Sequence, residues 1–472
     1  MRPGRNQVNP FMKPTNDLGR DRVGPLLVRL ALPAIAAQLI NALYNIVDRI
    51  YIGHIPDTGD LALTGLGICF PVLMFLSALS ALVGMGGGSR AAIRMGEGQM
   101  EKANEILGNC AALLLVISAV VTVVFQIWKE PMLLLFGASE RTIGYATDYL
   151  GIYLWGTVFV QCALGLNNFI TTQGFAGFSM ATVVLGAVTN IILDPIFIFG
   201  LHMGVRGAAL ATVLAQGVSA VWVLIFLLGR RSKLRLQARY LRIRPSVLAP
   251  VVAIGVSPFI MQSTESLVNI ALNASLKHYG SDLDVGAMTI CSSVMQVFFM
   301  PFHGLAQGAQ PIIGFNYGAG QLERVKETFR LLFRSAVTLS VLVWAAVELF
   351  PGAFVALFND KPELVEAGVK ALRVYMACAF MMGIQSACQQ SFVALGQAKI
   401  SLFLALLRKV ILLIPLIFIL PLIFTQNQVF AVYLAEPVAD FLAAACTGMV
   451  FLRRFPRILE ARRRELESHS TQ

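Results

Sequence analysis

Charged residues are scarce in this sequence. Asp, Glu, Lys and Arg make up 13% of the 472 residues, while 57% are hydrophobic and the mean hydropathy is +0.71. Soluble domains carry about 25% charged residues, so a water-soluble globular fold is excluded. The alternating segments of about ten residues that build a membrane β-barrel are missing. What recurs instead are apolar windows of about 20 residues, each long enough to cross a bilayer as a helix.

Signatures of metal binding, disulfides and nucleotide hydrolysis are missing too. The seven cysteines lie inside apolar windows without CxxC or Cys/His spacing, which is typical of small buried residues. The glycine-rich stretch 84–98 contains no GxxxxGKS/T motif, and no HExxH or Ser/His/Asp set is present. Residues 1–22 are polar and basic, unlike a cleavable signal peptide. We therefore expect neither an enzyme nor a cofactor, and any work done across a membrane should draw on an ion gradient rather than on ATP.

Twelve apolar windows predict an all-α polytopic membrane protein with twelve transmembrane helices. With the amino terminus inside, most of the 37 Lys and Arg fall on the cytoplasmic side, so the positive-inside rule places both termini in the cytoplasm. The net charge of +11 then reflects topology and anionic membrane lipids, and no nucleic-acid partner is expected. The predicted spans are 26–52, 61–92, 104–127, 145–170, 179–200, 206–228, 246–276, 285–314, 326–350, 368–394, 400–424 and 428–452.

An internal repeat divides the chain in two, because GEGQMEKANE at 96–105 matches GAGQLERVKE at 318–327. Six spans return a chain to its starting side, so the halves are predicted to be parallel repeats about an axis along the membrane normal. That geometry permits alternating access by rocking. The predicted parts are a cytoplasmic N-terminal segment 1–25, an N-lobe of helices 1–6 at 26–229, a basic cytoplasmic linker 230–245, a C-lobe of helices 7–12 at 246–453, and a basic cytoplasmic tail 454–472.

Polar side chains follow one face of the first span. Gln38, Asn41, Asn45 and Asp48 recur there at spacings of three and four residues. A carboxylate inside a span costs on the order of 2.5–3.5 kcal/mol, so Asp48 is expected to face a protein interior or a wet cavity. The alternative is that Asp48 only marks the outer end of the helix, since Gly53 follows shortly after it.

The next polar spans offer partners for Asp48. Asn190 and Asp194 lie one helical turn apart in the fifth span, and the sixth contains Thr212. If these helices surround the first, two carboxylates meet in a low dielectric and cannot both stay ionised cheaply. A proton on one of them, or Na⁺ held by Asp48, Asp194, Asn190 and Thr212, would resolve the conflict. The alternative is that Asn190 and Asp194 only tie helices together.

The second half carries its acids at other positions. Glu265 shares a face of the seventh span with Asn269, where a carboxylate suits a cationic substrate. It can equally pair with Arg408 or Lys409 of the eleventh span. Candidates for lining a substrate cleft are Gln38, Asn41, Asn45, Glu265, Asn269, Gln385 and Gln389. His303, Glu436 and Asp440 also lie within spans, without an assigned role.

Three motifs carry a family resemblance: LYNIVDRIYIGH ending the first span, GSRAAIRMGEGQMEKA after the second and GAGQLERVKE after the eighth. With the twelve spans in two halves, they make residues 26–454 resemble the multidrug and toxic compound extrusion (MATE) transporters, in particular the MepA-like and DinF-like bacterial branch. The resemblance implies a V-shaped pair of lobes in the bacterial plasma (inner) membrane. It also implies export of bulky, often cationic or aromatic, drug-like compounds in exchange for H⁺ or Na⁺.

Residue by residue, the resemblance matches Asp48 to the coupling aspartate of the family's first helix. It matches Asn190, Asp194 and Thr212 to the polar network of the amino-terminal lobe. Asn167 matches the asparagine of the fourth helix, and Glu265 matches a seventh-helix acid. The tenth-helix aspartate of some branches is absent, with Gln385 nearby, which weakens the expectation of a cation site in the C-lobe.

Two other functions remain open at this point. A flippase for lipid-linked precursors, from the same superfamily, would need several Arg or Lys in its cleft for the diphosphate, and Arg408 and Lys409 are the main midspan cations. A receptor or scaffold without turnover would more often carry a soluble domain, and the loops here are short. No obligate protein partner is evident.

Overall fold

The computed structural model describes residues 16–358 and 361–470, and these form helices joined by turns and short loops. Ten of the described helices are long and apolar enough to cross a membrane, and two bent pairs raise the number to twelve if each pair is one span. The predicted all-α polytopic class is confirmed. Residues 1–15 of the predicted N-terminal segment and 471–472 of the predicted tail lie outside the described residues.

The first eight α-helices form what we call the N-terminal bundle. Its fourth span bends by 60° at Gly156, where a Cβ atom would come 2.5 Å from Val213 of α8, so the chain turns at a close helix–helix contact. The elements are α1 (Val23–Gly53), α2 (Gly59–Gly96), α3 (Met100–Leu135), α4 (Ile143–Trp155), α5 (Thr157–Gln161), the π-helix η1 (Cys162–Leu166), α6 (Asn167–Thr172), α7 (Ala176–Pro195), the π-helix η2 (Ile196–Gly200) and α8 (Val205–Leu228).

The remaining helices form the C-terminal bundle, which follows the short 3₁₀-helix η3 (Ala238–Tyr240). Its bent span is the tenth, with 45° between α13 and α14. The elements are α9 (Pro245–Tyr279), α10 (Asp282–Gly318), α11 (Leu322–Leu349), α12 (Pro351–Ala356), α13 (Pro362–Tyr375), η4 (Ala379–Met381), α14 (Met382–Ala394), α15 (Ala398–Leu406), the π-helix η5 (Leu407–Leu413), α16 (Ile414–Ile423) and α17 (Gln428–Ser470).

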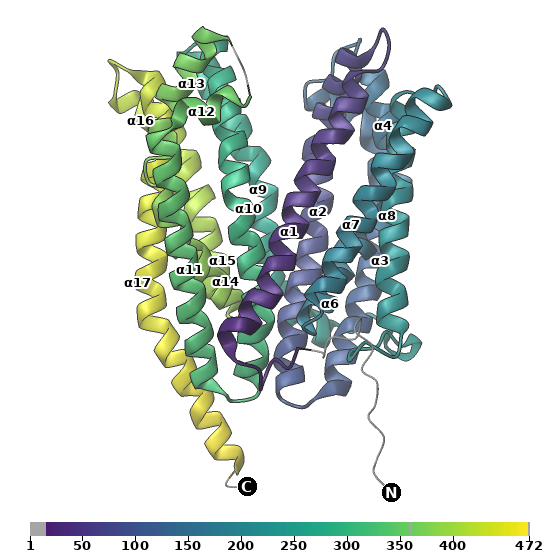
Figure 1. Ribbon diagram of the computed structural model, residues 1–472, viewed down its shortest axis with the longest axis vertical. Coiled ribbons are helices and arrows are strands. Elements are labelled where there is room, and N and C mark those ends of the chain that lie inside the picture. Colours follow the sequence, from purple (N-terminus) through teal and green to yellow (C-terminus); the bar gives the residue numbers. More distant parts are fainter. Residues whose placement is uncertain (1–15, 359–360, 471–472) are drawn as a thin grey trace, which may run out of the picture.

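The two bundles diverge away from the end at which α1 begins and α17 ends (Figure 1). We call that end the basic end, because it holds the loop after α8 and the Arg-rich end of α17. Glycines let the bundles touch there through their backbones. A Cβ atom at Gly96 of α2 would lie 2.0 Å from the carbonyl oxygen of Phe315 in α10, and one at Gly318 would lie 2.0 Å from that of Ile93.

A second pair of glycines extends this seam. In α2, a Cβ atom at Gly86 would lie 2.2 Å from the carbonyl oxygen of Val251 in α9. In α10, one at Gly308 would lie 2.6 Å from the backbone nitrogen of Ala31 in α1. Each bundle therefore offers the helix after its first span to the other bundle, as the internal repeat requires.

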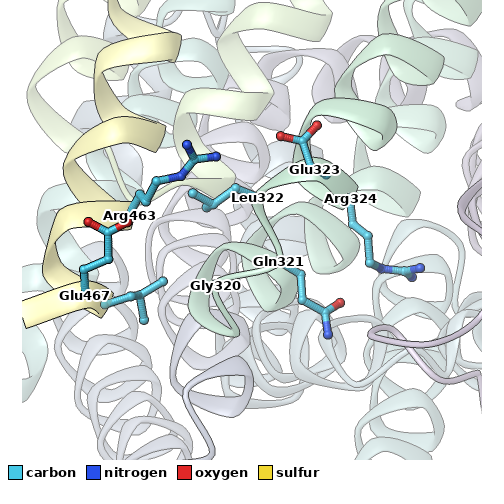
Figure 2. A pocket seen from close by; sticks show the side chains of 8 residues that line it. Gly320, Gln321, Leu322, Glu323, Arg324, Arg463 and Glu467 are labelled. Atoms are coloured by element: carbon cyan, nitrogen blue, oxygen red, sulfur yellow. The ribbon is translucent and has the colours of Figure 1, made fainter. Parts of the chain in front are cut away.

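The last helix reaches well past the predicted end of its span at residue 452. It continues to Ser470 because the segment is rich in Arg, Glu and Leu, which favour helix, and Glu460 pairs with Arg464 one turn later. Its extension packs over the turn between α10 and α11, where Gly320, Leu322, Arg463 and Leu466 help to line an open pocket of about 550 Å³ (Figure 2).

Arg462, on this extension, joins the two bundles. Its Nη2 atom donates to Oε1 of Glu97, 2.9 Å away beyond the end of α2, and to the carbonyl oxygen of Gly318 at 3.0 Å. The segment before α1 also spans both bundles. Asn16 donates to the carbonyl oxygen of Gly174 at 2.9 Å, and Arg324 donates to backbone oxygens of that segment. The basic end is thus held shut by side chains as well as by glycines.

Candidate functional site

Asp48 and Asp194 meet inside the N-terminal bundle, where α1 packs against α7 and α8. The two residues are 7% and 0% exposed, and their carboxyl groups lie within electrostatic range of each other. Two bare carboxylates near each other in a low dielectric repel, so a proton or a cation between them is favoured. Asp48 lies near the outer end of α1, and its side chain is buried in the bundle rather than exposed there.

Asn190 and Thr212 complete this cluster. Nδ2 of Asn190 lies 3.3 Å from Oδ1 of Asp194 and 3.4 Å from Oγ1 of Thr212, which itself donates to the carbonyl oxygen of Ala208 at 3.0 Å. One oxygen atom on each of Asp48, Asp194 and Asn190 is buried without a hydrogen-bond partner among the described residues. Oxygen atoms of this kind suit a proton or a hard cation such as Na⁺.

Local sequence explains how α7 and α8 present these groups. Asn190 and Asp194 share a helix face because they are one turn apart. Pro195 lacks a backbone N–H, and the helix widens directly after it into the π-helix η2. Gly207 lets α8 approach η2, since a Cβ atom there would lie 2.8 Å from the carbonyl of Phe197.

Two tyrosines near Asp48 were not predicted from the sequence as members of this cluster. Tyr44 and Tyr149 lie within electrostatic range of the Asp48 carboxyl group. Tyr44 precedes Asp48 by one helical turn. The helical spacing that identified the polar face of the first span could therefore also have placed Tyr44 beside Asp48. Tyr149 lies in α4, about 100 residues away along the chain, and nothing in its local sequence places it beside α1.

Other predicted residues lie apart from this cluster. Asn167 donates to the carbonyl oxygen of Ser179 at 3.2 Å and accepts from Thr182 at 3.0 Å. Thr182 precedes Asn190 by eight residues, which is about 12 Å along α7. On α1, Asn41 and Asn45 are exposed and Gln38 is half-buried, so of the four polar residues on that face only Asp48 enters the cluster.

In the C-terminal bundle, Glu265 pairs with Lys409, which settles the choice of partner that the sequence left open. The Glu265 side chain is 57% exposed, whereas that of Lys409 is 7% exposed. The carboxyl group thus lies on an accessible surface with the ammonium group beneath it. Asn269, one turn away, accepts a hydrogen bond from Ser292 of α10 at 3.3 Å. Glu265 is therefore exposed on one side and paired with Lys409 on the other.

Gln385 and Gln389 are buried rather than exposed. Nε2 of Gln389 donates to Ser257 at 3.0 Å and to the carbonyl oxygen of Ser401 at 2.8 Å. Both glutamines line a cavity of about 40 Å³ beside Arg408, which has room for a few water molecules and none for a drug-sized compound. His303 is exposed at the edge of the same cavity, with its ring edge-on to Phe299.

Comparison with known proteins gives consistent relatives. A sequence model of the MatE family matches residues 33–196 and 258–419. The multidrug export protein MepA of Staphylococcus haemolyticus is 24% identical over 417 residues, covering 88% of this chain and 91% of that protein. MepA of Staphylococcus aureus is 26% identical over 433 residues, covering 91% and 93%.

A solved structure shares the fold. The outward-facing conformation of a multidrug resistance MATE family transporter of the MOP superfamily matches with a TM-score of 0.86 at 23% identity. The match covers 95% of this chain and the whole of that one. The two-bundle architecture is therefore a fold already known among membrane proteins.

Proposed function

The chain belongs to the MatE family, the multidrug and toxic compound extrusion transporters, and on that premise we propose that it exports drug-like compounds in exchange for H⁺ or Na⁺. The relatives named as multidrug export proteins match along nearly their full length, which supports this class of activity. The protein is a multi-pass membrane protein, and we place it in the plasma (inner) membrane with the basic end in the cytoplasm, following the charge distribution.

The buried pair of Asp48 and Asp194 carries the proposal. With a cation or proton bound, the two carboxyl groups sit together and hold α1 against α7. Once the site is empty, two carboxylates in a low dielectric repel, and α1 is free to shift away from α7. The ion therefore binds one arrangement of the helices better than the other, which is the only way in which it can move their equilibrium.

An ion gradient supplies the energy in this scheme. Each elementary charge that crosses the membrane field contributes about 2.3 kcal/mol per 100 mV. Loading of Asp48 and Asp194 from the outside favours one orientation, and release into the cytoplasm restores the other. The contacts that hold the basic end shut must break in each cycle, because the substrate enters from that side. Alternating access then follows from rocking of two bundles that touch mainly through small residues.

A positively charged substrate fits the accessible groups. Glu265 exposes its carboxylate, and Asn41 and Asn45 expose amides on α1. A flippase for lipid-linked diphosphates is less well supported, because the main midspan cations, Arg408 and Lys409, are already paired with carboxylates. We therefore place drug-like cations first among the substrates.

Transport by purified protein in liposomes tests the proposal. Counterflow of a fluorescent cation such as ethidium should be driven by a pH gradient or by a sodium gradient, and the Asp48→Asn variant should lose this drive. Asp60→Asn, which changes an exposed aspartate of α2, is the matched control and should transport normally. Normal gradient-driven efflux by the Asp48→Asn variant would refute the assignment of Asp48 as a coupling residue.

A further inference from the structure

A second charged cluster lies deep in the C-terminal bundle, between η5 and α17. Nε of Arg408 donates to Oδ1 of Asp440 at 2.7 Å, and its Nη2 donates to Oε1 of Glu436 at 3.0 Å. The three side chains are 11%, 1% and 5% exposed, respectively. One guanidinium group therefore holds two carboxyl groups away from water.

The charges in this cluster do not balance. Arg408 carries one positive charge against two carboxyl groups, and the neighbouring Lys409 is already paired with Glu265. Oε2 of Glu436 and Oδ2 of Asp440 are buried without a hydrogen-bond partner among the described residues. A buried charge without compensation is strongly unfavourable, so the excess negative charge has to be neutralised.

The groups that face the two carboxyls from the surrounding helices do not supply that charge. Tyr375 at the end of α13 and Cys378 beyond it lie within electrostatic range, and both are neutral in their ordinary state. Lys409, from η5, is the second cation within range. Lys409 also donates to Glu265 and to the carbonyl oxygen of Met261, so Arg408 and Lys409 together supply two positive charges against three carboxyl groups.

A cavity with room for water lies beside the cations of the cluster. Arg408 and Lys409 line the 40 Å³ cavity together with Gln385, Gln389 and His303. The side-chain oxygens of both glutamines are buried without a partner among the described residues. Such oxygens and a cavity of this size are what ordered water requires. The π-helix η5 lets the two consecutive cations reach different helices, and such segments are frequent at functional sites.

From this arrangement we propose that Glu436 and Asp440 form a second proton-binding site, which holds one proton between two carboxyl groups clamped by Arg408. The ligand is a proton rather than a metal ion, because the guanidinium already occupies the position that a cation would take. The site is independent of Asp48 and Asp194, which lie in the other bundle. Its use in coupling transport rests on the proposed function, whereas proton binding itself does not.

Infrared difference spectroscopy of the purified protein tests this directly. We would use Asp48→Asn/Asp194→Asn as background, so that the N-terminal pair contributes nothing. This background should still show the carbonyl band of a buried protonated carboxylic acid, with the small shift expected in heavy water. The background variant keeps the native side chains of the cluster, so absence of the band would overturn the proposal. It would leave the proposed function intact.

Adding Glu436→Gln or Asp440→Asn should then remove the band. Each single change leaves Arg408 with one carboxylate, a balanced ion pair, so the protein is expected to fold, which gel filtration checks. Glu363→Gln, an exposed acid at the start of α13, is the control that keeps the band. Persistence of the band in both cluster variants would assign it to another group and refute the site.

Discussion

Gly96 and Gly318 stand at matching points of the two sequence halves, and each lies against the backbone of the helix that carries the other. A Cβ atom at either position would come 2.0 Å from a carbonyl oxygen three residues before its counterpart. The seam at the basic end therefore follows the symmetry of the repeat. Glycine is required there because any side chain would separate the helices.

We predict that Gly96→Ala weakens closure of the basic end. Overpacking costs about 1–3 kcal/mol, enough to shift a two-state equilibrium on the order of tenfold. A cysteine introduced at Ser89, which is buried on α2 and accepts a hydrogen bond from Gln310 across the seam, should react faster with a hydrophilic maleimide. Gly67→Ala on the same helix has open space around it and should leave the reaction rate unchanged. An equal rate in both variants would contradict the role of the seam.

The Arg462–Glu97 pair should add measurable stability. Hydrogen bonds to charged groups contribute about 1.5–3 kcal/mol, and these side chains are only 15% and 14% exposed. Glu97→Gln should lower the unfolding temperature of the purified protein. Glu101→Gln removes the partner of an exposed pair, in which Glu101 is 84% exposed, and should change it little. A larger drop for Glu101→Gln would show that burial does not decide the effect.

Removal of Arg408 should be far more damaging than removal of either acid that it holds. Breaking a buried ion pair on one side costs about 3–5 kcal/mol, and Arg408→Met would leave two carboxyl groups without their cation. Expression yield and unfolding temperature should fall sharply in this variant and only slightly in Asp440→Asn. Comparable stability of the two variants would mean that Arg408 does not organise the cluster.

Substitution of Asn190 should change the ion dependence of transport, whereas substitution of Asn167 should not. Asn190→Ala removes the donor shared by Asp194 and Thr212, so about 1.4 kcal/mol of lost binding would raise the half-saturating ion concentration about tenfold. Asn167→Ala breaks contacts about 12 Å away along α7, and its ion dependence should match that of the unchanged protein. Ion-dependent counterflow in liposomes measures both. A tenfold effect at Asn167 would favour the role that the family resemblance assigns to it.

Much of the fold could be predicted without coordinates, because a bilayer admits few solutions. Every backbone polar group must be bonded within the hydrocarbon, so apolar windows of about 20 residues become helices. The matching segments 96–105 and 318–327 indicated the two halves. The spacing of Asn190 and Asp194 placed them on one helix face, since the α-helical period is a local property. The continuation of α17 to Ser470 was missed, because hydropathy reports the membrane and not the length of a helix.

No local sequence pattern predicted which side chains meet across helices. Asp48 lies beside Asp194, Glu265 forms an ion pair with Lys409, and Arg408 forms ion pairs with Glu436 and Asp440. All three outcomes depend on how each helix is rotated and how closely glycines let it approach its neighbours. Those quantities are fixed by packing against residues of other helices, which lie tens to hundreds of positions away along the chain. Periodicity therefore revealed the polar faces, while the packed bundles determined which faces became sites.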